Sequence, residues 1–487
     1  MIWLAGSPAL SDTPDPLAEL EALSKIIQDS IESIKSSLSS KNMDFPSPYT
    51  PMSLESEAAR MQPEVDQACA MITAAAYQLI SDVRSPMLTI VTVATQYALS
   101  ASLGIATAAN VPEALREAGP KGAHVVEIAK ASSIDPTKLS RVLRVLATNH
   151  IFLEVAPDVF AHNRISSCLD TGKSVETLLA SATTISPGTK HVNTTGIAAG
   201  IGHCTDEALK SAAYLQDALL DPAFACSQEP TETARNLAFE TNTAMFEWLE
   251  KEGNEHRLLR FGITMEGAKQ ASPPNAIMEG FDWQGLKKNS LVVDVGGGIG
   301  AQSMTLVQHF PHLRFVIQDR ESTVEEAIQF WDRQLPGARS TGKVVLQIHD
   351  LFAPQPVCDA AVYLLRNIIH DWPDKYCLQI LRHLRKAATS DTRLVIVDSL
   401  VSYACEDRSL EGILGARRVV PPKPLLSNMG HAAAASYFTD IQMMELLNGK
   451  ERTLKEIKDL MEASGWKVVQ IHQSLAFSTA KVIGTPA

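Results

Sequence analysis

The chain has 487 residues, of which 45% are hydrophobic and 20% are charged, so it is long enough for two or three domains with sizeable cores. Its formal net charge of −12 argues against a protein whose main task is to bind nucleic acid or an anionic membrane. The seven cysteines form no C-x-x-C pair, and their odd number favours reduced thiols over a disulfide framework.

Residues 1–60 are predicted to form an N-terminal helix and a linker. The opening stretch MIWLAGSPAL lacks the basic residues of a secretion signal, so we expect a cytoplasmic protein. In residues 17–41 apolar side chains recur at helical spacing, which predicts an amphipathic helix. Its apolar stripe packs either on its own domain or on a second copy of the chain. Three prolines within residues 42–53 mark the linker.

Residues 61–280 are predicted to form a mainly helical domain. The stretch 60–120 is rich in alanine, and helical periods resume from 170 to 280. We expect no stretch in the chain to reach the roughly 20 apolar residues of a membrane span. The sequence therefore predicts no membrane partner.

Residues 124–166 have the pattern of a winged helix. A helix is followed by a turn, by a second helix from Pro136 to about Asn149, and by a two-stranded hairpin. A winged helix can bind DNA, which makes a non-enzymatic regulatory protein one alternative. The second helix, however, carries only three basic residues in an acidic chain, which disfavours nucleic acid as a partner: Lys138, Arg141 and Arg144.

Residues 281–487 alternate short β-branched runs with helical stretches. Such a pattern predicts an α/β domain with a Rossmann-like, doubly wound parallel sheet that is buried on both faces. Only a short turn joins the last two runs, so the last strand is expected to be antiparallel to its neighbour. The long stretch 403–435 is typical of a functional loop. The predicted strands are 291–295, 314–319, 343–350, 359–365, 393–401, 466–473 and 476–484.

The first of these strands leads into a glycine-rich loop, DVGGGIG, at residues 294–300. Glycines there allow a ligand to approach the backbone closely, and Asp319, at the end of the next strand, can accept two ribose hydroxyls. The loop departs from the dinucleotide pattern G-x-G-x-x-G and contains the carboxylate of Asp294, which would repel a pyrophosphate. A positively charged ligand such as S-adenosylmethionine is therefore favoured over the cofactor of a nicotinamide-dependent oxidoreductase, the second alternative.

Two more polar sites are expected at the same edge of the sheet. Asp350 and Leu351 follow the third strand and can hold an adenine ring, although an acidic strand end before a turn is also common. His370, in RNIIHDWPD, follows the fourth strand and lies where ligands of open α/β sheets bind. Imidazole titrates in the range that a general base needs to activate a phenol.

A general base is helped by an acidic partner that holds its second nitrogen. Two candidates are Asp398, which ends the strand RLVIVD, and Glu451, in NGKERT. Without further context, Glu451 is equally well explained as a surface charge between Lys450 and Arg452.

Together these motifs resemble one known family. In order and spacing, DVGGGIG, the Asp319 strand end, HDLF, RNIIHDW and NGKERT look like the class I S-adenosylmethionine-dependent O-methyltransferases of the caffeate type, especially the fungal members that act on phenols and polyketides in secondary metabolism. The resemblance covers about residues 85–485. Its winged-helix segment is similar to that family's dimerisation domain, which implies a homodimer.

The resemblance also implies roles for individual residues. His370 would deprotonate the acceptor hydroxyl with the help of Asp398 and Glu451, although the family often has Glu at the first of these positions and Asp is shorter. No metal is implied. The donor S-adenosylmethionine would be held by Gly296, Gly297, Gly298, Asp319, Asp350, Leu351 and Arg366.

The acceptor pocket is the least specific part of the pattern. Phe246, Trp248, Phe261 and Met265 lie in a stretch similar to the family's substrate helices, and Met443 and Met444 precede NGKERT. Aromatic and methionine side chains suit a flat phenolic ring, but at such spacing they also form ordinary core. The resemblance implies a small aromatic or polyketide acceptor without identifying it.

Overall fold

The computed structural model describes residues 15–184, 189–270, 275–407, 412–416, 420–473 and 479–487. The opening stretch MIWLAGSPAL therefore lies outside the described residues.

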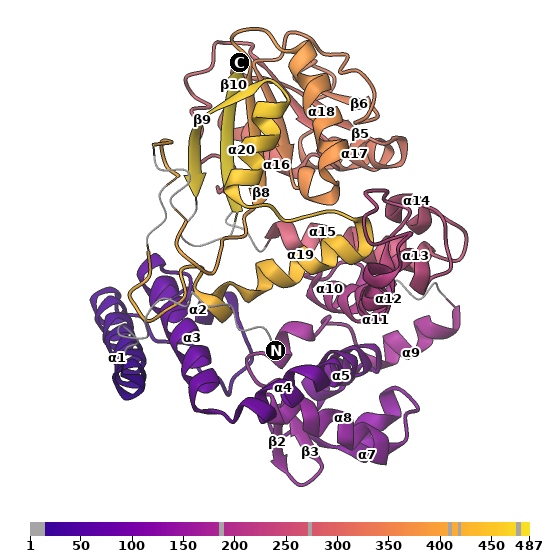
Figure 1. The fold of residues 1–487 in the computed structure, drawn as a ribbon. Helices are drawn as coiled ribbons and strands as arrows, with labels where there is room; N and C mark the ends of the chain where they lie inside the picture. The colour runs from indigo at the N-terminus through magenta and orange to yellow at the C-terminus, as the bar shows by residue number, and fades with distance from the viewer. Residues whose placement is uncertain (1–14, 185–188, 271–274, 408–411, 417–419, 474–478) are drawn as a thin grey trace.

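A seven-stranded sheet forms the centre of the C-terminal half (Figure 1). Its strand order is β6-β5-β4-β7-β8-β10-β9. The first five strands in this order are parallel, and β10 is antiparallel to both of its neighbours. The predicted fold class, with its antiparallel last strand, is confirmed. The bounds are β4 Leu291–Val295, β5 Arg314–Asp319, β6 Val344–Ile348, β7 Val362–Arg366, β8 Arg393–Ser399, β9 Trp466–Gln473 and β10 Thr479–Pro486.

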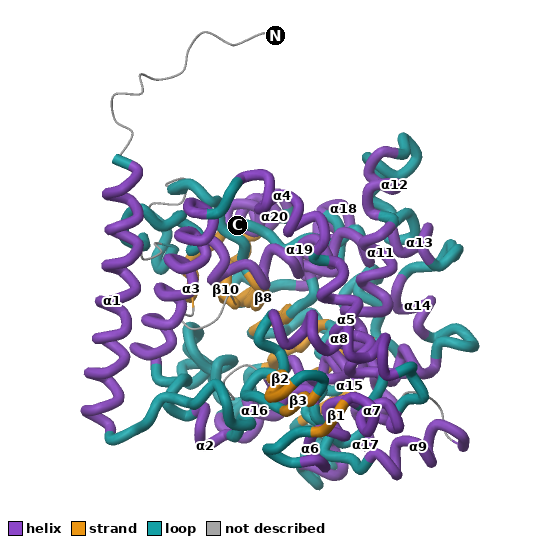
Figure 2. The backbone as a smooth tube through the Cα atoms, turned by 90° about the horizontal axis from the view of Figure 1, so that it is seen from below, coloured by secondary structure: helices purple, strands orange, loops and turns teal. Residues whose placement is uncertain are grey.

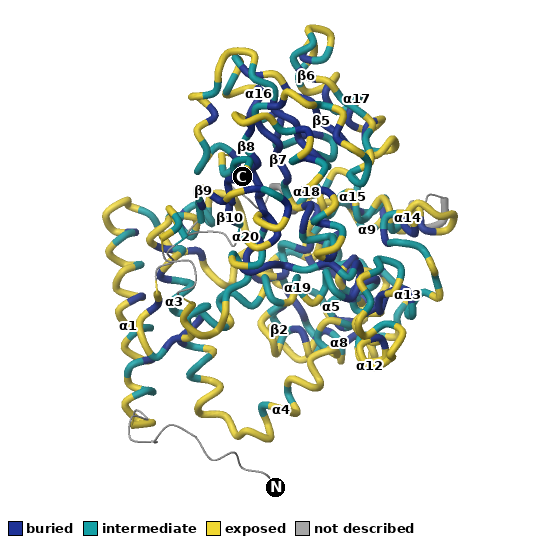
Figure 3. Tube along the Cα trace, turned by 45° about the horizontal axis from the view of Figure 1, so that its top comes forward, coloured by how far each residue is buried: buried dark blue, intermediate teal, exposed yellow. Residues whose placement is uncertain are grey.

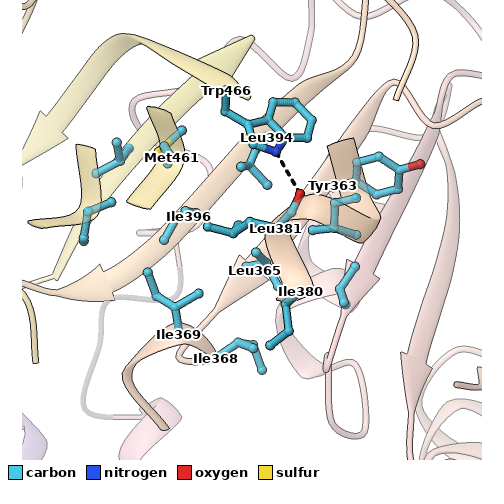
Figure 4. Close-up of a cluster of buried hydrophobic side chains, with 14 of the residues drawn as sticks. Tyr363, Leu365, Ile368, Ile369, Ile380, Leu381, Leu394, Ile396, Met461 and Trp466 are labelled. Carbon is cyan, nitrogen blue, oxygen red and sulfur yellow. Dashed lines mark hydrogen bonds between the residues drawn. The ribbon is translucent and has the colours of Figure 1, made fainter. Parts of the chain in front are cut away.

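The sheet is covered by helices on both faces, which explains its nearly continuous apolar strands. Val293 and Leu365 belong to one core cluster, whereas their neighbours Val292 and Leu364 belong to another, because successive side chains point to opposite faces. In the first cluster, Trp466 packs against the sheet and its indole N–H donates to the carbonyl of Leu381 (3.1 Å; Figure 4). Helices α18 (Asp374–Ala387) and α20 (Leu454–Ala463) complete this cluster, and α16 (Ala301–His309) and α17 (Glu321–Gln334) complete the other.

The predicted winged-helix segment folds as a short helix, a turn, a second helix and a hairpin. The second helix, α8 (Pro136–Thr148), starts at Asp135, whose carboxylate accepts from two backbone N–H groups. Arg144 on this helix is paired with Glu154 and Asp158 of the hairpin. These two carboxylates offset the positive charge that would be needed to bind a nucleic-acid phosphate. The other elements are β1 Ala123–His124, α7 Val125–Ile128, β2 Leu153–Ala156 and β3 Val159–Ala161.

The predicted N-terminal helix is α1 (Pro16–Lys41), and it lies beside α3 (Pro63–Val83) at the edge of the molecule (Figure 2). Leu23 of α1 is fully buried against Ala74 and Ala75 of α3. We call α1 and α3 together the N-terminal hairpin. The domain boundaries at residues 60 and 280 stay predictions.

Helices α4 (Pro86–Thr95) and α5 (Tyr97–Ala108) correct one expectation. The stretch Pro86–Ala108 is, by length and composition alone, long and apolar enough to cross a membrane. Small residues, mostly alanine and threonine, interrupt its larger apolar side chains, which is why the run was missed in the sequence. Nearly all of α4 is exposed (Figure 3), including Met87, Ile90 and Val93 at 78%, 70% and 61%.

Apart from α2 and α19, the remaining helices belong to the helical domain (Figure 1). Helix α19 passes between the sheet and the helical domain (Figure 1). Their bounds are α2 Leu54–Glu57, α6 Val111–Ala118, α9 Val175–Thr184, α10 Ile197–His203, α11 Leu209–Ala213, α12 Leu215–Leu220, α13 Ala234–Ala238, α14 Met245–Leu249, α15 Glu255–Gln270 and α19 Ala434–Leu447, and a π-helical turn spans Cys204–Ala208.

Candidate active site

The glycine-rich loop closes tightly onto the neighbouring strand β5. The N–H groups of Gly296 and Gly297 both donate to the carbonyl of Gln318, and the N–H of Gly298 donates to Oδ2 of Asp319 (2.8 Å). Gly296 and Gly298 have φ of 70° and 60°, which side chains rarely adopt. A Cβ at Gly297 would lie 2.6 Å from Cγ of Asp294, so the loop needs glycine there. The predicted loop and Asp319 are therefore in direct contact.

The remaining donor-side residues lie at the ends of adjacent strands. Asp319 is paired in register with Ile348, and Asp350 follows two residues later. Asp350 is exposed, and its Oδ1 accepts from the N–H of Phe352 (2.9 Å). Leu351 packs close to Gly296. The strand ends thus bring a half-buried carboxylate, an exposed one and an apolar side chain to one edge of the sheet.

Asp294 is at the start of the glycine-rich loop, and Arg366 ends the neighbouring strand β7. The carboxylate of Asp294 is buried and accepts from the hydroxyl of Ser303 (2.6 Å). Burial lowers the pKa of Arg366, and the charges of Asp294 and Asp398 oppose that effect. This donor set consists of carboxylates and one guanidinium, so it fits a ligand with a ribose diol and positive charge better than a pyrophosphate. The residues present fit S-adenosylmethionine.

His370 lies in a turn that the NGKERT segment holds in place. After β7, Asn367 adopts φ of 52° and a 3-10 turn covers Ile369–Asp371. The N–H of Lys450 donates to the carbonyl of His370 (2.7 Å), and Arg452 donates to the carbonyls of Ile369 and Trp372. Arg452 is almost fully buried, so it is not a surface charge. Its hydrogen bonds hold the backbone of the turn from inside the protein.

The two nitrogens of His370 face two different carboxylates. Nδ1 lies 2.8 Å from Oε1 of Glu451, whose side chain is only 1% exposed, so Glu451 is not a surface charge. Since a carboxylate only accepts, Nδ1 carries the hydrogen and Nε2 is left to accept a proton. Nε2 lies 3.4 Å from Oδ1 of Asp371, a residue that the sequence analysis did not single out. The side chain of His370 remains 18% exposed.

Asp398 lies near His370 without bonding to it. It is 2% exposed, and neither carboxylate oxygen makes a hydrogen bond within the described residues. Burial, together with the charges of Glu451 and Asp371, raises the pKa of Asp398 to about 7, although His370 and Arg452 act in the opposite direction. Asp398 therefore influences His370 through its charge, whereas Glu451 also holds the ring.

This cluster strongly favours a protonated His370. Burial disfavours the imidazolium, but the carboxylates of Asp371, Glu451 and Asp398 outweigh it and raise the pKa of His370 to about 10. Burial likewise raises the pKa of Asp371 to about 6, although the charge of His370 opposes it. The arrangement can take a proton from an acceptor and stabilise the imidazolium that forms.

The predicted acceptor residues are only partly brought together. Phe246, Trp248, Phe261 and Met443 share one apolar cluster, whereas Met265 and Met444 are not members of it. Met265 is 39% exposed. Trp248 is buried, its ring is tilted by 48° against that of Phe239, and two arginines lie over it, which is typical of core packing.

Sequence reasoning also missed a polar network beside this apolar cluster. It joins α10 and the π-helical turn to α15, and the ring of His203 meets that of Phe261 edge to face (5.6 Å between ring centroids). Only charge alternation within two helices could have indicated it. Its ion pairs link Asp206 and Glu207 to Arg257 and Arg260. Within the described ranges, no three His, Cys, Asp or Glu side chains are grouped to hold a metal.

Comparison with known proteins gives two family models and close relatives. An O-methyltransferase domain model matches residues 235–467, and an O-methyltransferase dimerisation domain model matches residues 91–172. An O-methyltransferase of Armillaria gallica is 40% identical over 93% of this chain and 95% of its own. A protein named 4-O-methyltransferase 1, from Phanerochaete chrysosporium, is 38% identical over 95% and 96%.

The fold is also similar to that of solved structures. The structure of OxaC in complex with SAH and oxaline matches with a TM-score of 0.64 and 18% identity, over 96% of this chain and 100% of that one. At this identity the likeness concerns the fold alone.

Proposed function

This chain belongs to the S-adenosylmethionine-dependent O-methyltransferases, and from that premise we propose that it methylates a phenolic hydroxyl of a small aromatic or polyketide acceptor, with His370 as general base. The observation that carries the proposal is the position of His370. It follows β7 at the ligand edge of the sheet, beside the glycine-rich loop, with Nδ1 held by Glu451 and with Nε2, 3.4 Å from Asp371, able to take up a proton when the ring is neutral.

The donor would be held at the ends of β4, β5 and β6. The loop Gly296–Gly298 and Asp294 would face its amino acid part, Asp319 its ribose, and Asp350 with Leu351 its adenine, with Arg366 at the end of the adjacent strand β7. When bound, S-adenosylmethionine supplies a methyl group on a positively charged sulfur that a nucleophilic oxygen can take. The protein's own task is to align that oxygen and remove its proton.

Proton removal falls to Nε2 of His370. An ordinary phenol has a pKa of about 10, so transfer to an imidazole whose pKa is also about 10 is nearly balanced. Glu451 orients the ring, and Asp371 and Asp398 supply further negative charge that favours the imidazolium.

The acceptor class rests on relatives and on the aromatic cluster. The Phanerochaete chrysosporium relatives are named for 4-O- and 3-O-methylation, and a further relative is a sterigmatocystin 8-O-methyltransferase. Phe246, Trp248, Met265 and Met444 stay candidates for contact with the acceptor ring. Phe246 and Phe261 meet edge to face, which offers a wall for a flat ring (6.1 Å between centroids).

We further propose that the chain is a cytoplasmic homodimer. The dimerisation domain model begins within the exposed apolar helix α4, and a second copy would cover that surface. Seven free cysteines support a reducing compartment. Localisation of a fluorescent fusion in fungal cells tests the compartment.

Two measurements test the proposed reaction. In calorimetric titrations, S-adenosylmethionine should bind and NAD should not. The His370→Ala variant should keep donor affinity but lose turnover by roughly 10²–10⁴-fold, because it lacks the base. A panel of phenols, screened by mass spectrometry for the gain of one methyl group, identifies the acceptor. Undiminished methylation by His370→Ala would refute the role of this histidine.

A further inference from the structure

Two segments that carry none of the motifs lie against each other. One is the N-terminal hairpin, and the other is the loop between β8 and α19, residues 400–433, described except at 408–411 and 417–419. We call the second segment the β8–α19 loop. Its residue Leu425 is buried in one cluster with Leu23, Ala74 and Ala75 of the hairpin. The part of the loop around Leu425 is therefore packed against the hairpin, although its sequence has no regular pattern.

Polar and ring contacts from α3 hold the same part of the loop. The side-chain amide of Gln78 donates to the carbonyl of Pro424 (3.1 Å) and to Oε1 of Glu19 on α1 (3.2 Å). The ring of Tyr77 is stacked on that of His431, with 3.5 Å between centroids and 20° between planes. Two neighbouring residues of α3 thus contact the loop at two positions, Pro424 and His431.

Both ends of the loop are attached to the candidate active site. At its start, just after Asp398, the N–H of Val401 donates to the carbonyl of Arg452 (3.2 Å). Just beyond its end, Tyr437 on α19 connects the two ends of the loop. Its hydroxyl accepts from the N–H of Ser402, near the start of the loop (3.1 Å), and from the amide of Asn428, near its end (2.9 Å). One turn later on α19, Asp440 accepts from the N–H of Glu451, the partner of His370.

The order of the strands shows which side of His370 this loop serves. Apart from Arg366, which ends β7, the donor-side residues lie at the ends of β4, β5 and β6, and His370 follows β7. The β8–α19 loop leaves the next strand, β8, on the far side of His370 from the donor. A displacement of this loop would therefore move the acceptor side and leave the donor side in place.

We propose that Tyr77 and Gln78 are positioning residues for the acceptor: through the β8–α19 loop they set which hydroxyl of a polyhydroxylated aromatic ring reaches His370. This inference rests on the proposed function and names a determinant of its regiochemistry. The residues lie outside both matched family models, which begin at residues 91 and 235. Among the described residues, neither side chain makes a hydrogen bond or ring contact with the donor-side loop or with His370.

A catechol gives the sharpest test, because it offers two adjacent hydroxyls. The full-length chain, with S-adenosylmethionine, is given 3,4-dihydroxybenzaldehyde, and the ratio of 3-O- to 4-O-methyl products is measured. We expect Gln78→Leu and Tyr77→Ala to change this ratio by about threefold or more. The matched control is Gln28→Leu, an exposed glutamine on the same hairpin, which should leave the ratio unchanged.

A product ratio does not depend on how much enzyme is folded, so simple destabilisation would not change it. An unchanged ratio in both variants overturns the proposal. Hydrogen exchange with bound S-adenosylhomocysteine gives a second readout, in which peptides covering 420–433 should exchange faster in Gln78→Leu and peptides covering the glycine-rich loop should not. If the catechol is not methylated at all, the proposed acceptor class fails. The positioning role is then judged by hydrogen exchange alone, and unchanged exchange of residues 420–433 in Gln78→Leu would refute it.

Discussion

At the scale of single residues, the candidate base depends on groups far along the chain. Glu451, which holds Nδ1 of His370, lies 81 positions later, and its neighbours Lys450 and Arg452 hold the backbone of the same turn. Three consecutive residues therefore fix the position and the tautomer of His370, and one of them, Glu451, joins Asp371 and Asp398 in favouring its charged form.

The charge of Glu451 predicts a shifted pH profile. Because the pKa of His370 is raised to about 10, its neutral form is scarce at pH 7, and kcat with saturating donor should rise with pH above neutrality. Glu451→Gln removes one of the charges that raise this pKa, so the rising limb should move to lower pH while the maximal rate falls. A limb that stays in place in the variant would contradict the assignment of Glu451.

Asp398 predicts a pH-dependent effect on stability. Its pKa is raised from an ordinary value near 4 to about 7, so the folded state binds this proton more tightly than the unfolded state. The stabilisation is complete below about pH 4 and is lost as the pH rises through 7. Asn carries no charge at either pH. The Tm of Asp398→Asn minus the Tm of the natural chain should therefore be larger at pH 8 than at pH 5. The exposed Asp391→Asn should show no such difference.

The sequence located these residues but not their contacts. His370 and Glu451 belong to short motifs, so their roles could be predicted. Asp371 could not, because neighbours in an extended chain point to opposite faces, and only the 3-10 turn brings its carboxylate near Nε2. Whether Asp398 forms a hydrogen bond with the ring depends on how the side chains pack, which no pattern in the sequence contains.

At the scale of elements, a buried pair of amides connects the donor-side loops. The side chains of Gln318 and Gln355 donate to each other (2.8 and 2.9 Å), and Gln318 also donates to Gln347 (2.8 Å). Gln318 is the last residue of β5 before Asp319, and Gln355 follows the segment that contains Asp350 and Leu351. The pair therefore holds two donor-side segments together.

Gln318→Leu is expected to weaken donor binding selectively. The oxygen of Gln355 still accepts from the N–H of Val357, but the variant leaves its buried side-chain N–H group without an acceptor, which costs roughly 1–3 kcal/mol. We expect the affinity for S-adenosylhomocysteine, measured by calorimetry, to fall by about three- to tenfold, with kcat at saturating donor little changed. Gln329→Leu, at an exposed position on α17, is the control. Equal affinities of the two variants would count against this role.

Elements were predicted well where burial dictates the sequence. The strands of the sheet are continuous apolar runs because both faces are covered, and the start of α8 follows from Asp135 and Pro136. The amphipathic stripe of α1 predicted a buried face but not its partner. An apolar stripe fits any apolar surface, and only the structure shows that α3 and the β8–α19 loop supply it.

At the scale of the whole molecule, α4 leaves an apolar surface uncovered. Met87, Ile90 and Val93 are all more than 60% exposed, and this helix overlaps the matched dimerisation domain. Ile90→Asp should place charges in the proposed interface and convert the dimer to a monomer in sedimentation velocity experiments. Leu220→Asp, at an exposed position on α12, should not. A dimer that survives Ile90→Asp, or flotation of the natural chain with liposomes, would argue that another partner covers α4.

The packing of the N-terminal hairpin on the β8–α19 loop has a consequence for protein engineering. Exchanging acceptor loops between relatives is a common route to chimaeras with new substrate ranges. In this chain the loop is complementary to α1 and α3, which lie more than 300 residues earlier in the sequence. If residues 400–433 alone were replaced by those of a relative, the new loop would not match the surface of α1 and α3. Active chimaeras should therefore take the N-terminal hairpin and the loop from the same parent.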